Sequence, residues 1–108
     1  FFLMGWGVPP FDSQYVFDFL IHTKTDDLGG WNASNYSNAD VDAMIDTLSS
    51  DVDEENRNNT VAQIWEQVQE DRVLLAVHNQ LLAYATREGV NIEVHPENQP
   101  VIYNVTFD

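Results

Sequence analysis

Two segments of the chain repeat apolar residues at positions i, i+3, i+4 and i+7, and this pattern constrains the fold more than any other feature. Residues at that spacing share one face of an α-helix, because the helix completes a turn every ~3.6 residues. The positions are Val41, Met44, Ile45 and Leu48 in the first segment, and Val61, Ile64, Trp65 and Val68 in the second. Each segment therefore predicts an amphipathic helix that buries one face in a core.

Residues that cap helix N-termini stand before both segments. Ser37 or Asn38 precedes the first segment, and Asp53 precedes the second. Side-chain oxygens of these residue types accept hydrogen bonds from the free N–H groups at a helix start. The stretch SSDVDE leaves only a short turn between the helices, and short connections join antiparallel neighbours. The sequence thus predicts an antiparallel helical hairpin.

A further helix is predicted near the N-terminus, where Asp12 or Ser13 caps a segment that runs to about His22. The stretch QYVFDFLI is so rich in apolar and aromatic residues that we expect this helix to be buried on most sides. The following stretch, Lys24–Ser37, contains two adjacent glycines and many Asn and Ser residues. That composition is typical of a loop.

The C-terminal third changes character and predicts strands. The run VLLAVHNQLLAYATRE is long enough for a helix, which is the alternative. Its β-branched residues and central HN favour two buried strands, Val73–Val77 and Leu81–Arg87. After a loop, the alternating stretch Val101–Phe107 predicts a final strand. The hairpin and these strands give an α+β fold class for the 108 residues.

The net charge is strongly negative, because eighteen acidic residues stand against four basic ones, which gives −14. Nucleic-acid binding needs Lys and Arg side chains that displace counterions from phosphates, so the charge argues against this class of partner. Anionic membrane surfaces are disfavoured for the same reason. We interpret the charge as a solvated acidic surface.

Residues that carry catalysis or hold metals do not form productive patterns. The chain has no Cys, and His22, His78 and His95 are far apart, without a close ligand pair. The stretch DVDEEN resembles the start of a calcium loop, but it lacks the glycine and glutamate that such a loop requires later. No nucleophile motif is present. We therefore expect no enzymatic activity, no metal site and no cofactor.

Four aromatic residues, Trp6, Phe11, Trp31 and Tyr36, have loop-like surroundings in the sequence. Aromatic rings offer stacking area and nearby Asn and Asp side chains fix orientation, which is the chemistry of a small-molecule cleft. The alternative is that Trp6 and Trp31 only cover the end of the helical hairpin. Composition does not decide between these two interpretations.

One ordered pattern runs through nearly the whole chain. The pattern begins with a Gly-Trp turn, which is followed by a loop with prolines and an acid. The motif sN-x-x-x-D-x-x-I comes next, and D-x-x-x-R stands at the start of the long helix. The pattern ends with an apolar strand and a strand that finishes in R-x-G-V. The matching residues are Gly5, Trp6, Ser37, Asn38, Asp42, Ile45, Asp53, Arg57, His78, Arg87, Gly89 and Val90. In this order the chain resembles the C-terminal part of the family 5 extracellular solute-binding proteins, which serve peptide/nickel-type ABC importers.

The resemblance implies a two-lobed α/β fold of the type II periplasmic-binding-protein class. Residues 1–72 would belong to the second lobe, and residues 73–108 would cross the hinge and return toward the first lobe. Such proteins are several times longer than this chain, which begins with Phe, so we expect it to be a piece of a longer protein. Such a piece is expected to expose apolar surface, or to dimerise and cover it.

The resemblance also implies a function. The protein would capture oligopeptides or related solutes outside the cytoplasmic membrane and deliver them to an ABC transporter permease. It would be periplasmic or otherwise extracytoplasmic, and would meet the membrane only through the permease or a lipid anchor. The residues expected to bind the solute are Trp6, Gly7, Phe11, Asp12, Trp31 and Asn35.

Pro9 departs from the pattern of the peptide-binding members. They carry an Asp three residues after the Trp of the turn, where it pairs with the free amino group of the peptide. This chain has Pro9 there, and Asp12 matches a later acid that shapes the loop. A fixed carboxylate is the obvious way to hold a buried ammonium group. Oligosaccharides or other uncharged solutes are therefore an alternative to peptides.

A small acidic helical interaction domain without a small-molecule ligand is the alternative function. The two functions differ in what they predict for Trp6 and Trp31. A solute-binding protein predicts partly exposed rings that line a concavity with Asp12 or Asn35. An interaction domain predicts rings that are buried against the apolar face of the longer hairpin helix.

Overall fold

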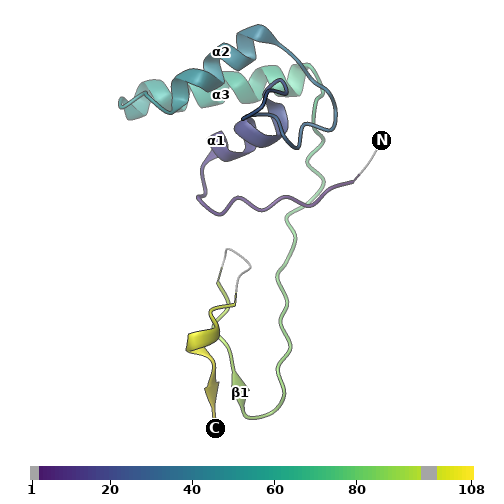
Figure 1. The fold of residues 1–108 in the computed structure, drawn as a ribbon, viewed down its shortest axis with the longest axis vertical. Coiled ribbons are helices and arrows are strands. Elements are labelled where there is room, and N and C mark those ends of the chain that lie inside the picture. Colours follow the sequence, from purple (N-terminus) through teal and green to yellow (C-terminus); the bar gives the residue numbers. More distant parts are fainter. Residues whose placement is uncertain (1–2, 96–99) are drawn as a thin grey trace. The chain divides into compact units, whose positions relative to one another are not determined.

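The computed structural model describes residues 3–95 and 100–108, and these form two compact units (Figure 1). Pro10–Ala76 makes the first, which we call the helical unit, and Phe1–Pro9 with Val77–Asp108 makes the second, the terminal unit. The α-helices of the described residues lie in the helical unit, and their short strands lie in the terminal unit. The fold is therefore α+β, as the sequence predicts.

The first helix begins where the sequence predicts. Helix α1, Ser13–Val16, is capped by Asp12, whose carboxylate accepts a hydrogen bond from Gln14 N at 2.8 Å. It continues as a π-helical turn, η1, Phe17–Ile21, in which His22 N donates to Phe17 O at 2.9 Å. The sequence pattern does not predict this change to π geometry. The predicted end near His22 is confirmed.

The predicted helical hairpin is confirmed. Helix α2, Ala39–Leu48, and helix α3, Glu54–Glu70, lie side by side (Figure 1). Of the two predicted caps of α2, Asn38 is the one that accepts bonds from the first turn, and Asp53 caps α3 as predicted. Both side chains therefore satisfy N–H groups that would otherwise be free at a helix start.

The core is confined to the helical unit. Among the described residues, the buried apolar side chains come from η1, α2 and α3. They are Phe17, Leu20, Ile21, Val41, Ile45, Leu48, Ile64 and Val68. The tilted rings of Phe17 and Trp65, whose centroids lie 4.9 Å apart, join η1 to α3. Most of the predicted apolar face positions are thus buried, while Met44, Val61 and Trp65 are half-buried.

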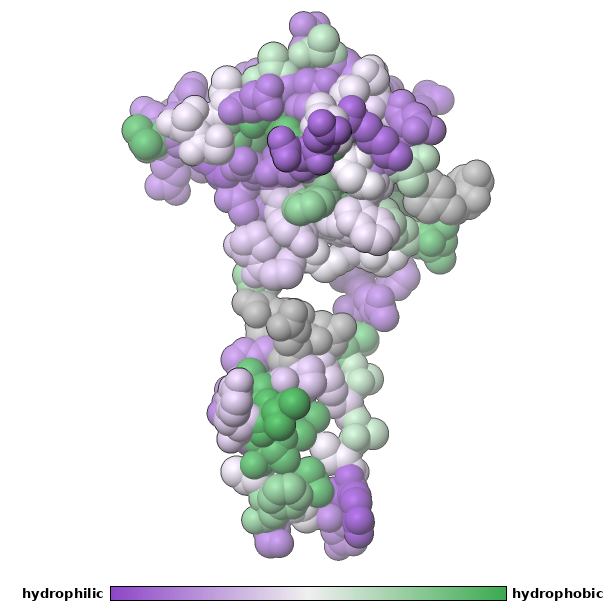
Figure 2. Space-filling model, viewed as in Figure 1, coloured by the Kyte–Doolittle hydropathy of each residue, from purple (hydrophilic) through white to green (hydrophobic). Residues whose placement is uncertain are grey.

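The terminal unit contains a small antiparallel sheet. Strand β1, Val90–Asn91, pairs with strand β2, Thr106–Phe107, and the single turn of 3-10 helix η2, Ile102–Asn104, precedes β2. The predicted strand Val101–Phe107 is therefore right only at its end. Figure 2 shows apolar side chains gathered on the visible face of this unit. Ile102 and Phe107 are among the exposed apolar residues of the unit.

The strands predicted at Val73–Val77 and Leu81–Arg87 are wrong. Residues 73–87 carry no assigned helix or strand, and residues 74–83 make no backbone hydrogen bond to another described residue. A strand is defined by its pairing, and an apolar sequence alone does not supply a partner. Leu75 and Leu81 are 80% and 91% exposed, so these segments are not buried.

The described helices are too short or too polar for a bilayer, and none of them could span a membrane.

Candidate functional site

The predicted solute-binding residues divide between the two units. The terminal unit holds Trp6 and Gly7, and the helical unit holds Phe11, Asp12, Trp31 and Asn35. Trp6 is half-buried, whereas Gly7 is exposed and a Cβ placed on it would meet no atom within 4 Å. The structure thus brings four of the predicted residues into one packed unit, and each of the four has a definite local role.

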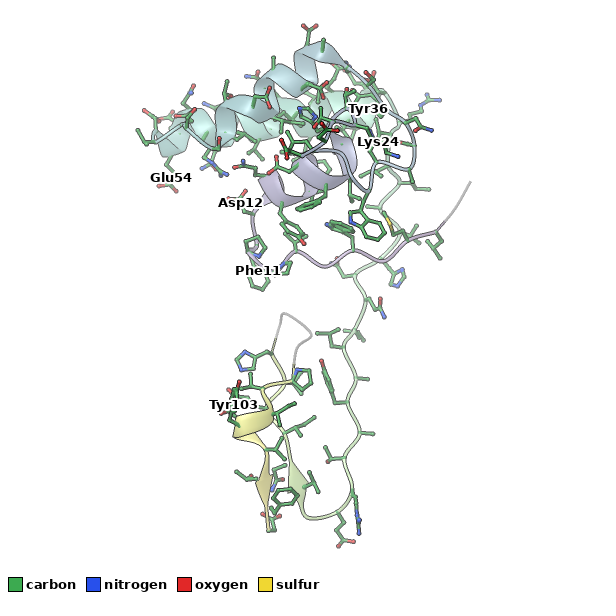
Figure 3. The ribbon with its side chains drawn as sticks, in the orientation of Figure 1. Phe11, Asp12, Lys24, Tyr36, Glu54 and Tyr103 are labelled. Carbon is green, nitrogen blue, oxygen red and sulfur yellow. The ribbon has the colours of Figure 1, made fainter. Side chains whose placement is uncertain are left out.

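Phe11 projects from the chain just before α1. Its side chain is 73% exposed (Figure 3), and its backbone has a φ of +54°. A residue other than glycine seldom adopts positive φ, which costs on the order of 1 kcal/mol or more. The next residue, Asp12, returns to extended backbone with a φ of −119° and caps the helix. The strained backbone at Phe11 therefore turns the chain into the helix and leaves the ring in solvent.

Asp12 has a structural partner, Arg57, on α3. Arg57 Nη2 lies 3.0 Å from Asp12 Oδ1 and 2.9 Å from Oδ2. The hydrogen bond from Gln14 N is the largest cause that lowers the pKa of the Asp12 carboxyl. Arg57 lowers this pKa further, and partial burial opposes both effects. Both carboxylate oxygens of Asp12 are thus engaged in hydrogen bonds that hold the loop.

Arg57 connects all three helices of the unit. Besides Asp12, it bonds Gln14 Oε1 through Nη2 at 3.1 Å, and Leu48 O at the end of α2 through Nε at 3.3 Å. The guanidinium has several donors in a fixed fork, so one side chain can serve several acceptors. The D-x-x-x-R pattern therefore has a physical meaning here. Asp53 starts the helix, and Arg57, one turn later, fixes it to its neighbours.

The backbone of Trp31 is fixed by hydrogen bonds, and much of the residue is exposed. The π-helical turn ends with free carbonyl groups, and Trp31 N bonds Phe19 O at 3.0 Å while Gly29 N bonds Asp18 O at 2.7 Å. Gly29 has a φ of +67°, and a Cβ there would lie 2.4 Å from His22 O. Only glycine fits this close approach. The Trp31 ring is 61% exposed, so it is an outward-facing aromatic surface on a fixed loop.

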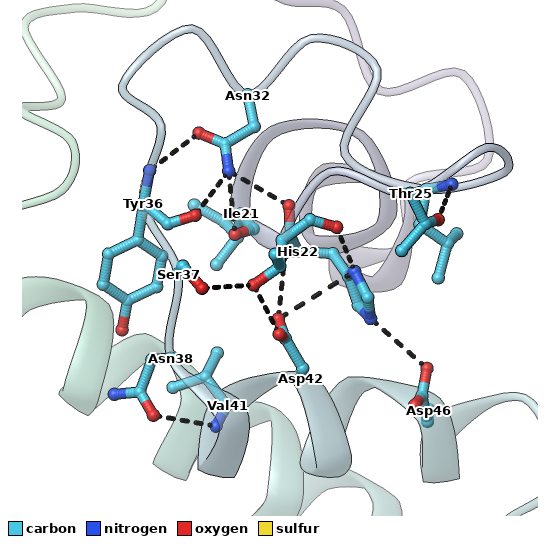
Figure 4. Close-up of polar contacts among 12 residues, drawn as sticks. Ile21, His22, Thr25, Asn32, Tyr36, Ser37, Asn38, Val41, Asp42 and Asp46 are labelled. Atoms are coloured by element: carbon cyan, nitrogen blue, oxygen red, sulfur yellow. Dashed lines mark hydrogen bonds and ion pairs between the residues drawn. The ribbon is translucent and has the colours of Figure 1, made fainter.

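Asn32 organises this loop from within, and the sequence reasoning missed it. Its side chain is almost wholly buried, with 1% exposure. Its Nδ2 donates to His22 O at 3.0 Å and to Tyr36 O at 2.8 Å (Figure 4), and its Oδ1 accepts from Tyr36 N and Ser34 Oγ. A buried amide with all these bonds rigidifies its surroundings. The only sequence signal is an Asn between glycines and serines, which many loops share.

Asn35 is exposed, and its backbone has a φ of +55°, which Asn tolerates better than most residues. The neighbouring Tyr36 is tied to the end of α3, where its hydroxyl donates to Asp71 Oδ2 at 2.6 Å. Burial, followed by this bond to Asp71, raises the pKa of Tyr36 to about 12. Tyr36 is therefore a structural link between the loop and α3.

A polar cluster joins the end of η1 to α2 (Figure 4). Thr23 donates to the Asp42 carboxylate through both its backbone N and its hydroxyl. The buried His22 ring adjoins this pair, with Nδ1 2.7 Å from Thr23 O and Nε2 3.5 Å from Asp46 Oδ1. In the described part of the chain, no group of three or more His, Cys, Asp and Glu residues could hold a metal ion. The cluster gives Asp42, a residue of the family pattern, a role in fixing the loop.

The arrangement as a whole presents exposed rings on a rigid frame. Phe11 and Trp31 offer stacking area, and the acids and amides next to them in sequence are occupied with holding the backbone. Such rings can contact a flat or cyclic solute. Comparison with family models, with curated proteins and with solved structures finds no match for this chain.

Proposed function

We propose that this chain is the C-terminal part of the substrate-binding component of an ABC importer. In this proposal it is not an enzyme and uses no cofactor. It contributes to the second lobe of a type II periplasmic-binding fold and captures oligopeptides or related solutes outside the cytoplasmic membrane. The solute passes to a permease. The protein meets the membrane through this permease or through a lipid anchor.

The observation that carries the proposal is the exposure of Trp31, at 61%, on a loop whose backbone is fixed by buried bonds. The exposed part of a large apolar ring contributes little to folding, whereas an anchored ring loses little entropy when a ligand stacks on it. Phe11, 73% exposed beside the cap of α1, has the same character. Two such rings in one packed unit support a binding role over a purely structural one.

The contacts of Asp12 bear on the class of solute. Its carboxylate is shared between Gln14 N and Arg57, so it is already neutralised by partners within the unit. With Pro9 at the position of the usual acid, this loop offers no uncommitted carboxylate to a peptide ammonium group. A peptide would then be held by its backbone and side chains, while an oligosaccharide needs only ring stacking and amide contacts.

A thermal-shift screen tests the proposal on the longer protein that it requires, with short peptides, oligosaccharides, opines and metal chelates as ligands. A ligand that binds the folded state raises the melting temperature by mass action. We expect a hit, and we expect Trp31→Ala to abolish or weaken it. Tyr103→Ala is the matched control, because Tyr103 is an aromatic residue with 94% exposure outside the predicted set.

Each outcome of the screen has a clear meaning. A sugar hit without peptide hits supports the proposal together with the argument from Pro9. A peptide hit supports the proposal but contradicts that argument. No hit on the whole panel, or hits that Trp31→Ala leaves unchanged, would contradict the role given to Trp31.

A small acidic helical interaction domain is the second candidate. It is favoured by the self-contained core of the helical unit, whose buried residues all lie between Phe17 and Val68. Under this function the exposed rings would meet a protein surface. No small molecule would then raise the melting temperature, which separates it from the first candidate.

A further inference from the structure

The segment Val73–Thr86 is the longest stretch of this chain without a charged residue. It holds no Asp, Glu, Lys or Arg, although the chain has 18 acidic and 4 basic residues. Arg72 and Arg87, which are two of those four basic residues, flank it. Two copies of a protein with a net charge of −14 repel one another over most of their surfaces. A segment without acidic residues adds nothing to that repulsion.

The backbone of the same segment is largely unpaired. Its residues carry no assigned helix or strand, and residues 74–83 make no backbone hydrogen bond within the described parts of the chain. Leu75, Val77 and Leu81 are 80%, 66% and 91% exposed. A second strand can pair with an extended backbone whose N–H and C=O groups are unpaired and whose side chains are apolar. Natural proteins often prevent such pairing with charged residues on exposed edge strands. Here the charge is absent.

The sequence of the segment is complementary to itself in the antiparallel direction. Two apolar blocks, VLLAV and LLAYA, flank the polar centre HNQ. With Asn79 of each copy on a two-fold axis, every apolar residue of one block faces an apolar residue of the other. The facing pairs are Val73 with Ala85, Leu74 with Tyr84, Leu75 with Ala83, Ala76 with Leu82, and Val77 with Leu81. Large residues mostly meet small ones, which suits close packing across a strand pair.

Other registers are worse. A shift by one residue places His78 opposite Leu81, or Val77 opposite Gln80, so polar groups face apolar ones. In the centred register, Arg87 of one copy stands opposite Asp71 of the other, and Glu88 stands opposite Glu70. The first pair is attractive and the second is repulsive, so the charges at the two ends do not select a register. The register therefore follows from the apolar blocks alone.

We propose that the 108-residue chain forms an isologous dimer in which Val73–Thr86 pairs antiparallel with the same segment of a second copy. A two-fold interface needs a self-complementary surface, and this segment is one. The inference goes beyond the proposed function and does not depend on it, since solute binding and self-pairing are measured separately.

Sedimentation velocity over a range of protein concentrations tests the dimer, at low salt and in about 0.5 M NaCl, where repulsion between the acidic copies is screened. We expect a monomer–dimer equilibrium that shifts to the dimer as salt rises. Leu81→Glu places a charge against Val77 of the other copy, and we expect the dissociation constant to rise about tenfold or more. Val52→Glu is the matched control, because Val52 is 99% exposed and lies outside the segment.

A thiol placed on the two-fold axis tests the register. The chain has no Cys, so Asn79→Cys carries a single thiol, and directly opposed residues of antiparallel strands lie about 4.5–5.5 Å apart, close enough for a disulfide. On mild oxidation we expect this variant to form covalent dimers at least about ten times faster than Val52→Cys. The reason is that the dimer holds its two thiols together, which raises their effective concentration. Gln80→Cys, whose thiols would not face each other, is expected to be slow.

Far-UV circular dichroism confirms that each variant keeps its helices, and Leu81 is too exposed for the substitution to disturb a core. A monomer at every concentration and salt would overturn the proposal. So would a dimer that Leu81→Glu leaves unchanged, or equal oxidation rates for the Asn79→Cys and Val52→Cys variants. Assembly past the dimer into fibres would also overturn it, because the second edge of the strand would then be in use.

Discussion

The helical unit and the terminal unit use similar apolar residues with different results. The helical unit buries Phe17, Ile45, Ile64 and the rest of the core, whereas the terminal unit has no fully buried residue among those described. Apolar content therefore does not decide which segment forms a core. In the helical unit the apolar residues recur at helical spacing, and capping side chains close each helix start, so local structure and burial support each other.

Core truncation should show the largest difference between the units. Ile64 is fully buried, so Ile64→Ala is expected to lower the free energy of unfolding by about 2–5 kcal/mol, because it removes apolar contacts and leaves a cavity. Leu81→Ala in the terminal unit, with 91% exposure, should stay within about 0.5 kcal/mol at low salt and low protein concentration, where the proposed dimer dissociates. Urea unfolding followed by circular dichroism measures both. Equal losses would mean that the terminal unit has a core after all.

Removal of the buried amide of Asn32 should come next. Asn32→Ala deprives His22 O and the backbone of Tyr36 of their partners, and we expect a loss of about 2–3 kcal/mol. Asn91→Ala in the terminal unit removes only an exposed bond to Asp108, so it should cost less than about 0.5 kcal/mol. A small loss at Asn32 in the same urea experiment would show that water replaces the amide.

A pair of glycines gives a third contrast. Gly29→Ala meets His22 O at 2.4 Å and needs a φ of +67°, so we expect a loss of about 1–3 kcal/mol. Gly7→Ala has open space around its new methyl group, and we expect it to change stability by less than about 0.5 kcal/mol. Thermal melts of the two variants side by side would decide this. If Gly29→Ala melts like the unsubstituted chain, the loop is not fixed as described.

The same contrast explains what the sequence could predict. The hairpin, its caps and the first helix follow from local spacing and capping residues, so they were predictable, and Asp53 and Asn38 act as expected. The strands at Val73–Val77 and Leu81–Arg87 were not, because a strand needs a partner that composition does not reveal. For the candidate site, the exposed rings could be proposed from loop-like surroundings. The role of Asn32 could not, since it depends on carbonyls ten and more residues apart.

Removal of the Asp12–Arg57 ion pair should lower the free energy of unfolding modestly, by an amount that depends on pH. The folded pKa of Asp12 is lowered, so its contribution is present above the unfolded value of 3.8 and is lost as pH falls through the folded pKa. Both side chains are partly exposed, so Asp12→Asn should cost less than about 1 kcal/mol at pH 7. Urea midpoints of this variant and of the unsubstituted chain should converge at acid pH. In the terminal unit, Glu93→Gln near His95 should have a still smaller effect.

Tyr36 gives an effect that is absent at neutral pH and appears only in alkali. Its pKa is raised to about 12, from an unfolded value of 10.0, by burial and by its bond to Asp71. A raised folded pKa means that the stabilisation is fully present below pH 10 and is lost as pH rises toward 12. A pH titration of the tyrosinate absorbance, from which the same titration of the Tyr36→Phe variant is subtracted, should show one tyrosine that ionises at unusually high pH. Asp71→Asn removes the charge that opposes ionisation, so this late tyrosine should then titrate at lower pH. A late titration that survives both substitutions would belong to another tyrosine, and the link between the loop and α3 would lose its electrostatic support.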